Sequence, residues 1–472
     1  MDSIKVLLDP LESFFATLSD YIWAGIPLGD GGLVIPVLIT LLLGVGVYLM
    51  FGLRFMPWRK LPYGISLLIR GAKTTAPGDV TPFQALMTTL SATVGTGNIV
   101  GVATAIALGG PGAIFWMWIT ALFGMATKYS EVLLAVHFRE LGANGKHVGG
   151  PMYYIKNGLH KRWHWLAIAY ASFGAIAGLG IGNMVQANSV ADAMESSFNL
   201  PAWLTGLVLA ALVGFVIIGG IKRIAAVAAK LVPFMAIAYI VCCVIVITNH
   251  WQNIPQVFVL IIDSAFNGAA ATGGFAGAAV WAAIRFGVAR GIFSNEAGLG
   301  SGSIAHAAAK TNSPVKQGFI GILGTFIDTL LICTMTAFVI LLTGVWTSGE
   351  NGHALSNLAF NSVLGDIGSN IIAIGLIIFA FTTLLGWSYY GERCAEYLFG
   401  QKIIFAYRLL WVVMIPLGAI GSLKIVWVFS DVMNGLMAIP NLIALMILSP
   451  IVFKITRQYF SNENLPKKGV KE

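Results

Sequence analysis

The strongest constraint on this chain is a series of long apolar runs that are almost free of charge. Of its 472 residues, 57% are hydrophobic and only 10% are charged, whereas a soluble domain carries about 25% charged residues. This is too little charge to cover a surface in contact with water, so the composition excludes a soluble enzyme, a disordered regulator and a secreted disulfide-bonded domain. We therefore expect an all-α polytopic membrane protein.

A transmembrane helix needs about 20 predominantly apolar residues, and eleven segments meet that requirement. They are 33–52, 83–108, 111–137, 165–190, 202–219, 231–248, 272–295, 317–343, 369–390, 403–421 and 432–453. If the N-terminus lies outside, 23 of the 28 lysines and arginines fall in cytoplasmic segments, and only Lys5 and Lys424 fall outside. Cytoplasmic loops carry an excess of basic residues. The sequence therefore predicts a multi-pass plasma-membrane protein with eleven spans, an external N-terminus and a cytoplasmic C-terminus.

Glycines interrupt two of these spans. In the second span, Gly95 and Gly97 flank Thr96 and are followed by Asn98, which favours an unwound stretch near the middle of the membrane. Free carbonyls there suit a cation, and the N–H groups of the following half-helix suit an anion, although close packing on a neighbouring helix also explains such glycines. The seventh span contains a second irregular segment at 272–277, which leads on to 290–301.

The two interrupted spans are five apart in order, and this spacing indicates a five-span repeat that is inverted in the membrane. Paired interrupted spans in corresponding positions indicate the central site of a transporter. At this point eight short stretches resemble the alanine or glycine:cation symporter family, also called the sodium:alanine symporters. The stretches are Phe83–Leu86, Gly95–Asn98, Gly109–Ala113, Gly124–Tyr129, Gly149–Tyr154, Gly182–Gln186, Phe293–Ser301 and Leu385–Glu392.

The resemblance implies a fold like that of the bacterial leucine transporter, with two inverted five-helix repeats preceded by one extra helix. The first helix of each repeat is expected to be unwound at mid-membrane. The implied organisation is an extracytoplasmic amphipathic segment at 1–32, the extra helix and a basic cytoplasmic loop at 33–82, a first repeat at 83–250, a connecting segment and second repeat at 251–455, and a cytoplasmic tail at 456–472. The resemblance also implies sodium-driven uptake of alanine or glycine by alternating access.

Substrate binding is expected at the break in the second span, where Thr96, Gly97 and Asn98 would meet the carboxylate of an amino acid. No aspartate or glutamate lies in 91–101, so the segment offers neutral oxygens, which suit Na⁺ better than a proton. Gln186 either contacts the substrate or forms an interhelical hydrogen bond. Candidate ligands for Na⁺ are Ser91, Thr93, Val94, Asn98, Thr382 and Thr383.

Thr383 and Trp387 are four residues apart and share one helix face. The family resemblance implies that this face closes the pocket, whereas the alternative is simple packing, with the threonine hydroxyls bonded to their own helix. On the seventh span, Ala276, Val280 and Trp281 are candidate pocket residues, and Trp281 faces either the site or lipid.

Charges within spans are normally paired or face a cavity. We expect Arg290 and Glu296 to form an inner-gate ion pair, with a static interhelical pair as the alternative. Lys128 and Glu131 are three residues apart and are expected to pair with each other. Asp328 is the deepest acid, and it either neutralises Arg285 or takes part in cation coupling.

The main prediction is sodium-coupled symport of a small neutral amino acid, and the alternatives are a proton-coupled or glutamine-preferring carrier, an ion channel or a membrane enzyme. A membrane enzyme would need a nucleophile–base pair or a metal cluster, and the seven histidines are scattered. We expect no cofactor apart from co-transported Na⁺. The expected partners are the amino acid, sodium and membrane lipids, without nucleic acid or an obligate protein partner.

Overall fold

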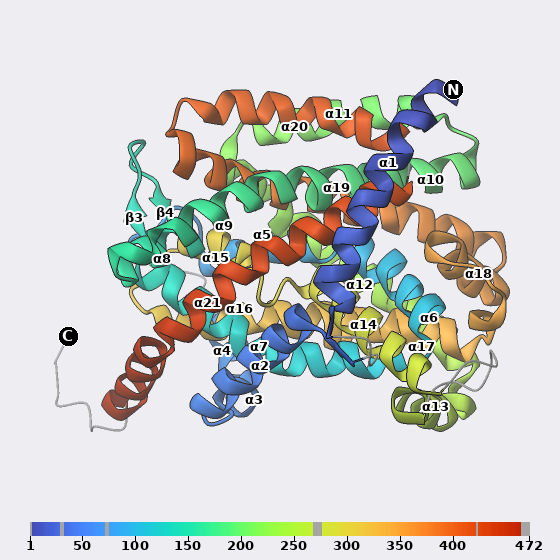
Figure 1. Ribbon diagram of the computed structural model, residues 1–472, viewed down its shortest axis with the longest axis horizontal. Coiled ribbons are helices and arrows are strands. Elements are labelled where there is room, and N and C mark those ends of the chain that lie inside the picture. The colour runs from blue at the N-terminus through green and yellow to red at the C-terminus, as the bar shows by residue number, and fades with distance from the viewer. Residues whose placement is uncertain (1, 29–32, 71–74, 268–275, 422, 464–472) are drawn as a thin grey trace.

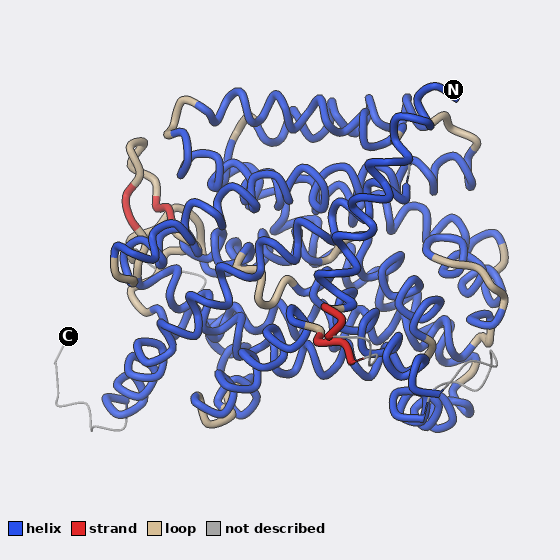
Figure 2. Tube along the Cα trace, viewed as in Figure 1, coloured by secondary structure: helices blue, strands red, loops and turns tan. Residues whose placement is uncertain are grey.

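The protein is almost entirely helical, with two short β-hairpins (Figure 2). The computed structural model describes residues 2–28, 33–70, 75–267, 276–421 and 423–463. One hairpin pairs β1 (Ile26–Leu28) with β2 (Leu33–Ile35), and the other pairs β3 (Glu140–Leu141) with β4 (His147–Val148), both antiparallel. The N-terminal segment, expected to be amphipathic, is helical and packs along the C-terminal helix, with Phe15 edge-on to Phe429.

In the described part of the first half of the chain there are ten α-helices. They are α1 (Asp2–Ser19), α2 (Val37–Gly52), α3 (Met56–Arg59), α4 (Leu61–Arg70), α5 (Pro82–Thr93), α6 (Val102–Gly109), α7 (Gly112–His137), α8 (Pro151–Gly158), α9 (His164–Ala177) and α10 (Val185–Phe198).

Eleven further α-helices follow. They are α11 (Ala202–Ile217), α12 (Gly220–Asn249), α13 (Ile254–Asn267), α14 (Ala276–Asn295), α15 (Ser301–Ala307), α16 (Pro314–Thr325), α17 (Thr334–Leu342), α18 (Gly352–Leu364), α19 (Asp366–Phe399), α20 (Ile403–Ile420) and α21 (Leu423–Glu463). Figure 1 shows α11 and α20 side by side along one edge of the molecule, while α5 and α19 lie nearer its centre.

Seven helical stretches in the described residues are long and apolar enough to cross a membrane, or eight when the bent pair formed by 82–93 and 97–109 counts as one span. Two shorter apolar helices are α2 and α11. The count of eleven spans and their arrangement as inverted repeats stay predictions.

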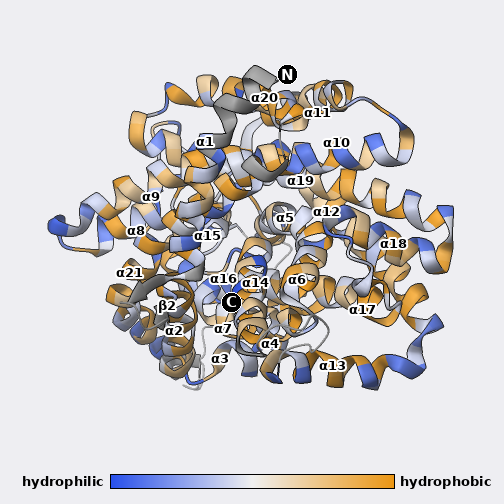
Figure 3. Cartoon of the chain, turned by 45° about the vertical axis from the view of Figure 1, so that its right-hand side comes forward, coloured by the Kyte–Doolittle hydropathy of each residue, from blue (hydrophilic) through white to orange (hydrophobic). Residues whose placement is uncertain are grey.

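The outer helices expose apolar side chains, as expected for contact with lipid. Apolar residues dominate α11, α12 and α20 in Figure 3. Exposed positions on these helices include Phe215, Phe234 and Phe405, whose exposed fractions are 67%, 65% and 78%. The interior is also apolar, so the difference from a soluble protein lies in the surface, which carries apolar side chains.

The second predicted span is interrupted, as the sequence predicts. Thr81 and Gln84 form reciprocal hydrogen bonds that start α5, with Pro82 in the first turn. The helix ends at Thr93, because Val94 has an extended backbone (φ −79°, ψ 92°). The chain resumes as a wide π-helical turn at Gly97–Gly101 that continues into α6, and the two halves are bent by 52°.

The seventh predicted span is also interrupted. The described break lies at residues 296–300, whereas the first irregular segment expected from the sequence is 272–277. Residues 272–275 of the glycine segment lie outside the described residues. The described break follows α14, where Glu296, Gly298 and Gly300 all have positive φ (57°, 97° and 76°), and a buried helix, α15, comes after it. Helix α14 ends at Asn295, the residue at which the predicted seventh span ends, and the break lies within the irregular stretch expected at 290–301.

Two more π-helical turns interrupt long helices. Gly178–Met184 joins α9 to α10, and Phe326–Cys333 joins α16 to α17. Such wide turns leave backbone groups without regular partners and occur often at functional sites. In this protein they carry or adjoin Gln186 and Asp328.

Candidate functional site

The candidate site is built around the break in the second span. Two backbone N–H groups of the break, those of Gly95 and Thr96, donate to side-chain amide oxygens. The N–H of Gly95 donates to Oδ1 of Asn98 (2.9 Å), and the N–H of Thr96 donates to Oε1 of Gln186 on α10 (3.2 Å). All four residues are buried. The structure therefore brings Thr96, Asn98 and Gln186 together, as predicted.

Thr383 on α19 completes the other side of the break. Its Oγ1 lies 3.4 Å from the carbonyl oxygen of Val94 and 3.0 Å from that of Phe379. A Cβ on Gly95 would lie 2.4 Å from Thr383 Oγ1 and 3.1 Å from Gln186 Oε1. Only glycine permits this approach, so neutral oxygens from three segments gather around one peptide group.

The other predicted sodium ligands are placed less directly. The hydroxyl of Thr382 donates to the Phe379 carbonyl (2.9 Å) and contacts the sulfur of Met235, so it faces α12. The hydroxyls of Ser91 and Thr93 donate to carbonyls of their own helix, at Thr88 (2.7 Å) and Leu90 (3.4 Å). Among the predicted hydroxyl ligands, and within the described residues, Thr383 alone contacts the backbone of the break.

Gly97 and Thr96 form the floor of the break. A Cβ on Gly97 would lie 3.2 Å from the Phe293 ring and 3.3 Å from Ser294 Cα, so glycine allows close contact with α14. The hydroxyl of Thr96 is buried and has no hydrogen-bond partner among the described residues. Buried hydroxyls are normally satisfied, and this one is therefore suited to receive a ligand.

Trp387 lies beside the glycines that precede Gln186. It is 2% exposed, and a Cβ on Gly182 would overlap its Cβ at 2.0 Å. Trp387 therefore bounds the space next to the Gln186 turn, in agreement with its predicted place on the Thr383 face.

The structure does not bring the predicted seventh-span residues to the break. Val280 and Trp281 are partly exposed, and Trp281 packs against the apolar core. Trp281 precedes Ser294 by 13 residues on the same helix, which corresponds to roughly 20 Å. Ala276 is the first residue of α14. The residues of α14 that meet the break are Phe293 and Ser294.

The gate prediction is wrong about the partner of Arg290. Arg290 donates two hydrogen bonds to the carboxylate of Asp431 on α21 (3.0 and 2.6 Å), and its guanidinium lies 4.9 Å from the ring of Trp427. Arg290 lies within α14, whereas Glu296 follows the end of that helix at Asn295 and has a positive φ. Glu296 instead accepts from the hydroxyl of Ser301 (2.6 Å).

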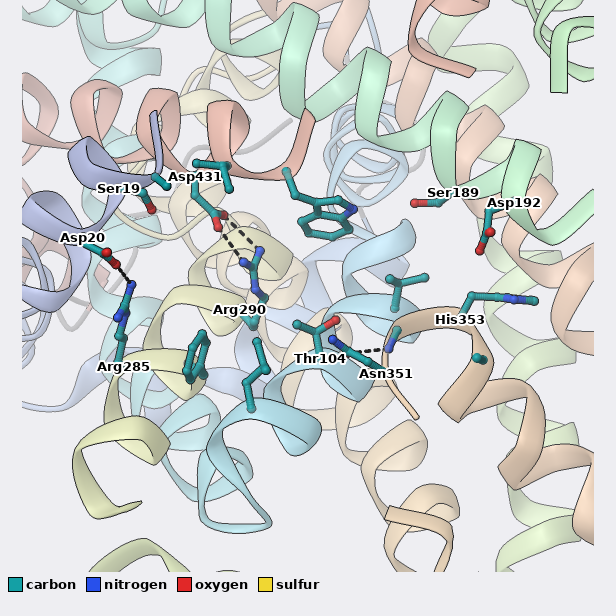
Figure 4. A pocket seen from close by; sticks show the side chains of 18 residues that line it. Ser19, Asp20, Thr104, Ser189, Asp192, Arg285, Arg290, Asn351, His353 and Asp431 are labelled. Atoms are coloured by element: carbon teal, nitrogen blue, oxygen red, sulfur yellow. Dashed lines mark hydrogen bonds and ion pairs between the residues drawn. The ribbon is translucent and has the colours of Figure 1, made fainter. Parts of the chain in front are cut away.

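The Arg290–Asp431 pair borders a vestibule of about 530 Å³ (Figure 4). Val100 and Ser189 line the same cavity. They follow Thr96 and Gln186 by four and three residues, or about one helical turn. The vestibule thus lies next to the break, on the face predicted to be extracytoplasmic.

The expected pair of Lys128 and Glu131 takes a different form. The ammonium of Lys128 donates to the backbone carbonyl of Glu296 (3.1 Å), and Oε1 of Glu131 accepts from the N–H groups of Gly298 (2.9 Å) and Gly300 (3.1 Å). Both side chains therefore stabilise the second break. Arg285 pairs with Asp20 (2.5 Å), so it does not neutralise Asp328.

On the predicted cytoplasmic face, the segment before α5 contacts the segment after α15. Val80 and Ala309 form a parallel β-bridge. The guanidinium of Arg139 donates to four carbonyls, namely those of Pro77, Ala307, Ala309 and Thr311 (2.7–3.1 Å). Burial lowers the pKa of Arg139 from its ordinary value, and the Asp79 carboxylate counteracts part of that effect. This clamp closes the predicted cytoplasmic side, and no motif in the sequence indicated it.

Comparisons with known proteins agree with this geometry. A model of the sodium:alanine symporter family matches residues 24–472. The sodium/alanine symporter AgcS of Methanococcus maripaludis is 46% identical over 95% of this chain and 97% of its own length. The probable sodium/glutamine symporter GlnT of Bacillus subtilis is 40% identical over 98% of this chain and 93% of its own.

A solved structure gives the fold. MhsT in complex with L-phenylalanine superimposes with a TM-score of 0.54 at 13% identity, over 81% of this chain and 99% of MhsT. The fold is of the leucine-transporter type, as expected from the sequence.

Proposed function

The chain belongs to the sodium:alanine symporter family, and from that premise we propose that it couples Na⁺ entry to the uptake of alanine or glycine. The family and the fold are those of membrane transporters and not of enzymes. The proposal adds the identity of the substrates, the residues that bind them and the alternating-access cycle.

One observation carries the proposal, namely the break at residues 94–96. A neutral amino acid has a carboxylate that suits the N–H groups after a break and the hydroxyl of Thr96. Gln186 and Asn98 hold the backbone of the break open through their amide oxygens. Trp387 limits the adjacent space, which favours a small side chain.

Sodium is proposed to bind between the Val94 carbonyl and the Thr383 hydroxyl. Hard neutral oxygens from a carbonyl and a hydroxyl suit Na⁺. A cation there would lie beside Gly95, next to the N–H groups that meet the substrate. Its charge would improve the same site for the carboxylate, so the two ligands would favour each other.

Alternating access would use the two closures at opposite faces. The Arg290–Asp431 pair would open and close the vestibule, while the Arg139 clamp would open the other side. The proposed frame is eleven spans with inverted repeats and an external N-terminus. This orientation places the vestibule outside the cell, where the substrate is taken up.

The test is uptake of radiolabelled glycine, alanine and glutamine by proteoliposomes that contain the purified protein. We expect saturable accumulation of glycine or alanine that requires an inward Na⁺ gradient. Glutamine should inhibit this uptake only weakly. GlnT carries glutamine in its name, so preferential glutamine uptake is the second candidate. Uptake that survives without Na⁺ and collapses with a pH gradient would refute sodium coupling.

A further inference from the structure

A basic elbow lies on the predicted cytoplasmic face and has no part in the proposal above. It comprises residues 53–60, which connect α2 to α4, and it carries Arg54, Arg59 and Lys60. All three side chains are exposed, and none of the ion pairs in the described part of the chain involves them. Residues 31–78 contain no aspartate or glutamate. The elbow therefore presents three positive charges that no acid of the same segment balances.

The backbone turns sharply at the start of the elbow. Arg54 and Phe55 both have positive φ (54° and 59°), a conformation that is costly for residues with a side chain and persists only where the surroundings hold it. Trp58 supplies one such anchor, because its Nε1 donates to the carbonyl of Leu122 on α7 (2.8 Å). The elbow is thus fixed to the helix bundle while its basic side chains stay exposed.

Exposed apolar side chains adjoin these cations. Phe51 is 61% exposed at the end of α2, and its ring centroid lies 5.0 Å from that of Phe55. Ile65 and Ile69 are four residues apart on one face of α4 and are 43% and 74% exposed. Basic residues beside aromatic rings and an exposed apolar helix face are typical of the level at which a membrane meets water.

The opposite side of α4 is packed against the bundle. A Cβ on Gly64 would lie 2.5 Å from the carbonyl oxygen of Phe319 on α16, and the ring of Tyr63 lies edge-on to the ring of Phe319. One face of α4 is therefore held by protein, and the face with Ile65 and Ile69 is free to meet lipid. The fold places this face directly after the three cations.

We propose that the elbow binds the phosphate of an anionic phospholipid of the cytoplasmic leaflet, with Arg54, Arg59 and Lys60 as its ligands. A guanidinium binds two phosphate oxygens at once, and an ammonium adds a point charge. The exposed face of α4 would then lie against the acyl chains. A soluble anion offers nothing to Ile65 and Ile69, and a zwitterionic lipid has no net charge for three cations to attract.

The lipid site also lies next to the inner closure. In the segment that follows α4, the carbonyl of Pro77 accepts from Arg139, and Val80 forms the β-bridge with Ala309. A lipid that holds α4 at the membrane surface would restrain this segment, which must move when the clamp opens. This consequence rests on the proposed function, whereas lipid binding itself does not.

The test measures which lipids surround α4. The full chain carries a fluorophore on the thiol of Ile65→Cys, in a Cys242→Ala background, because the other three cysteines are buried. The protein is reconstituted in phosphatidylcholine vesicles, with brominated phosphatidylglycerol or brominated phosphatidylcholine as the quencher. We expect phosphatidylglycerol to quench as if enriched about tenfold, because each basic residue near the surface contributes about fivefold and salt screens part of that attraction.

Two matched variants locate the preference. The test variant removes the three cations of the elbow, as Arg54→Gln/Arg59→Gln/Lys60→Gln. The control removes three exposed cations of other segments on the same predicted face, as Lys161→Gln/Arg162→Gln/Lys316→Gln. We expect the test variant to lose the preference for phosphatidylglycerol and the control to keep it. If the test variant does not elute as a single species in gel filtration, the double variant Arg59→Gln/Lys60→Gln leaves the strained turn intact and should lose most of the preference.

Four results would overturn the lipid site. One is equal quenching by both lipids in the wild type. Another is an equal loss of preference in the test variant and the control, which would reduce the effect to general surface charge. A third is loss of the preference when inorganic phosphate replaces chloride at equal ionic strength, which would identify a soluble anion as the ligand. The last is binding of a tetraglutamate peptide to the same three cations without any lipid preference, which would identify a protein partner.

Transport measurements separate this inference from the proposed function. Sodium-driven uptake by the wild type should be faster in vesicles that contain phosphatidylglycerol than in phosphatidylcholine alone, and the test variant should lose this dependence. If the wild type takes up no amino acid but phosphatidylglycerol is still enriched at α4, the proposed function fails and the lipid site stands. Equal uptake in both lipids, with the enrichment retained, would overturn the effect on the inner closure.

Discussion

The two helix breaks of this protein are stabilised by different chemistry. At residues 94–96, neutral amide oxygens from Asn98 and Gln186 accept the free N–H groups. At residues 296–300, one carboxylate, Glu131, accepts two N–H groups and the amide of Asn441 (2.8 Å). A break held by neutral amides leaves the Val94 carbonyl available to a cation, whereas a break held by a carboxylate carries its own charge.

The difference also appears in the backbone. The second break needs positive φ at Glu296, Gly298 and Gly300, but none of the residues 94–96 has a positive φ. Positive φ at a non-glycine residue costs of order 1–3 kcal/mol and must be offset by its surroundings. We infer that the second break is a fixed structural joint and that the first is the one that binds ligands.

The sharpest way to break this comparison is to remove the carboxylate that holds the second break. Glu131→Ala should destabilise the protein by about 3 kcal/mol, because it leaves two buried N–H groups and the amide of Asn441 without an acceptor. The measurement is the thermal midpoint of the purified protein in detergent. Glu140→Ala, at a half-exposed site in β3, is the control and should change the midpoint little. An unaltered midpoint in Glu131→Ala would show that the second break holds without the carboxylate.

The first break should respond in function and not in stability. Asn98→Ala removes the acceptor for Gly95 N–H and the donor to Asp328, and the loss of two buried contacts predicts about 100-fold slower uptake. Sodium-driven uptake in proteoliposomes measures this effect, and membrane insertion should be preserved. Asn267→Ala on α13 is the control. A fully active Asn98→Ala protein would remove Asn98 from the site.

The first break could be predicted from the sequence, but the contacts that stabilise the second break could not. Gly95, Gly97 and Asn98 are neighbours in the chain, so local composition alone indicates a weakened helix. Glu131 stabilises residues 298 and 300, which are more than 160 positions away, and no local pattern reports that contact. The sequence therefore indicated an irregular stretch at 290–301 but not the contact that stabilises it.

Separation along the chain also explains why the partner of Arg290 was predicted wrongly. Arg290 and Glu296 are close in sequence and have opposite charges, so pairing them was the simplest prediction. Asp431 lies on the last helix and 141 positions away. The Thr383 contact with Val94 was predictable through the family resemblance, and its separation of 289 positions could not be inferred from spacing.

Adjacent threonines sharpen the role of the first break in sodium binding. Thr383 faces the carbonyl of Val94, whereas Thr382 faces Met235 on α12. Thr383→Ala should raise the Na⁺ concentration for half-maximal uptake about tenfold, as expected from the loss of one ligand, while Thr382→Ala should change it by less than about twofold. Equal shifts in both variants would contradict the assignment of Thr383.

The smallest effect is expected at the ion pair above the first break. The side chains of Arg290 and Asp431 are 8% and 15% exposed, and they border the vestibule on the predicted outer face. Partly exposed pairs contribute on the order of 1 kcal/mol, which corresponds to about a fivefold change in the population of the open vestibule. Asp431→Asn keeps the shape of the side chain and removes its charge, so the closed form loses the ionic contribution, while Arg290 keeps its contacts with the rings of Phe293 and Trp427. The readout is the rate at which a membrane-impermeant maleimide labels a cysteine introduced at Thr104, which lines the same cavity.

Asp192→Asn is the matched control, since Asp192 also lines the vestibule but is outside the ion pair. Faster labelling in Asp431→Asn alone would assign the outer closure to this pair, and equal rates in both variants would place the closure in the apolar contacts of Phe293 and Trp427 (5.0 Å between ring centroids).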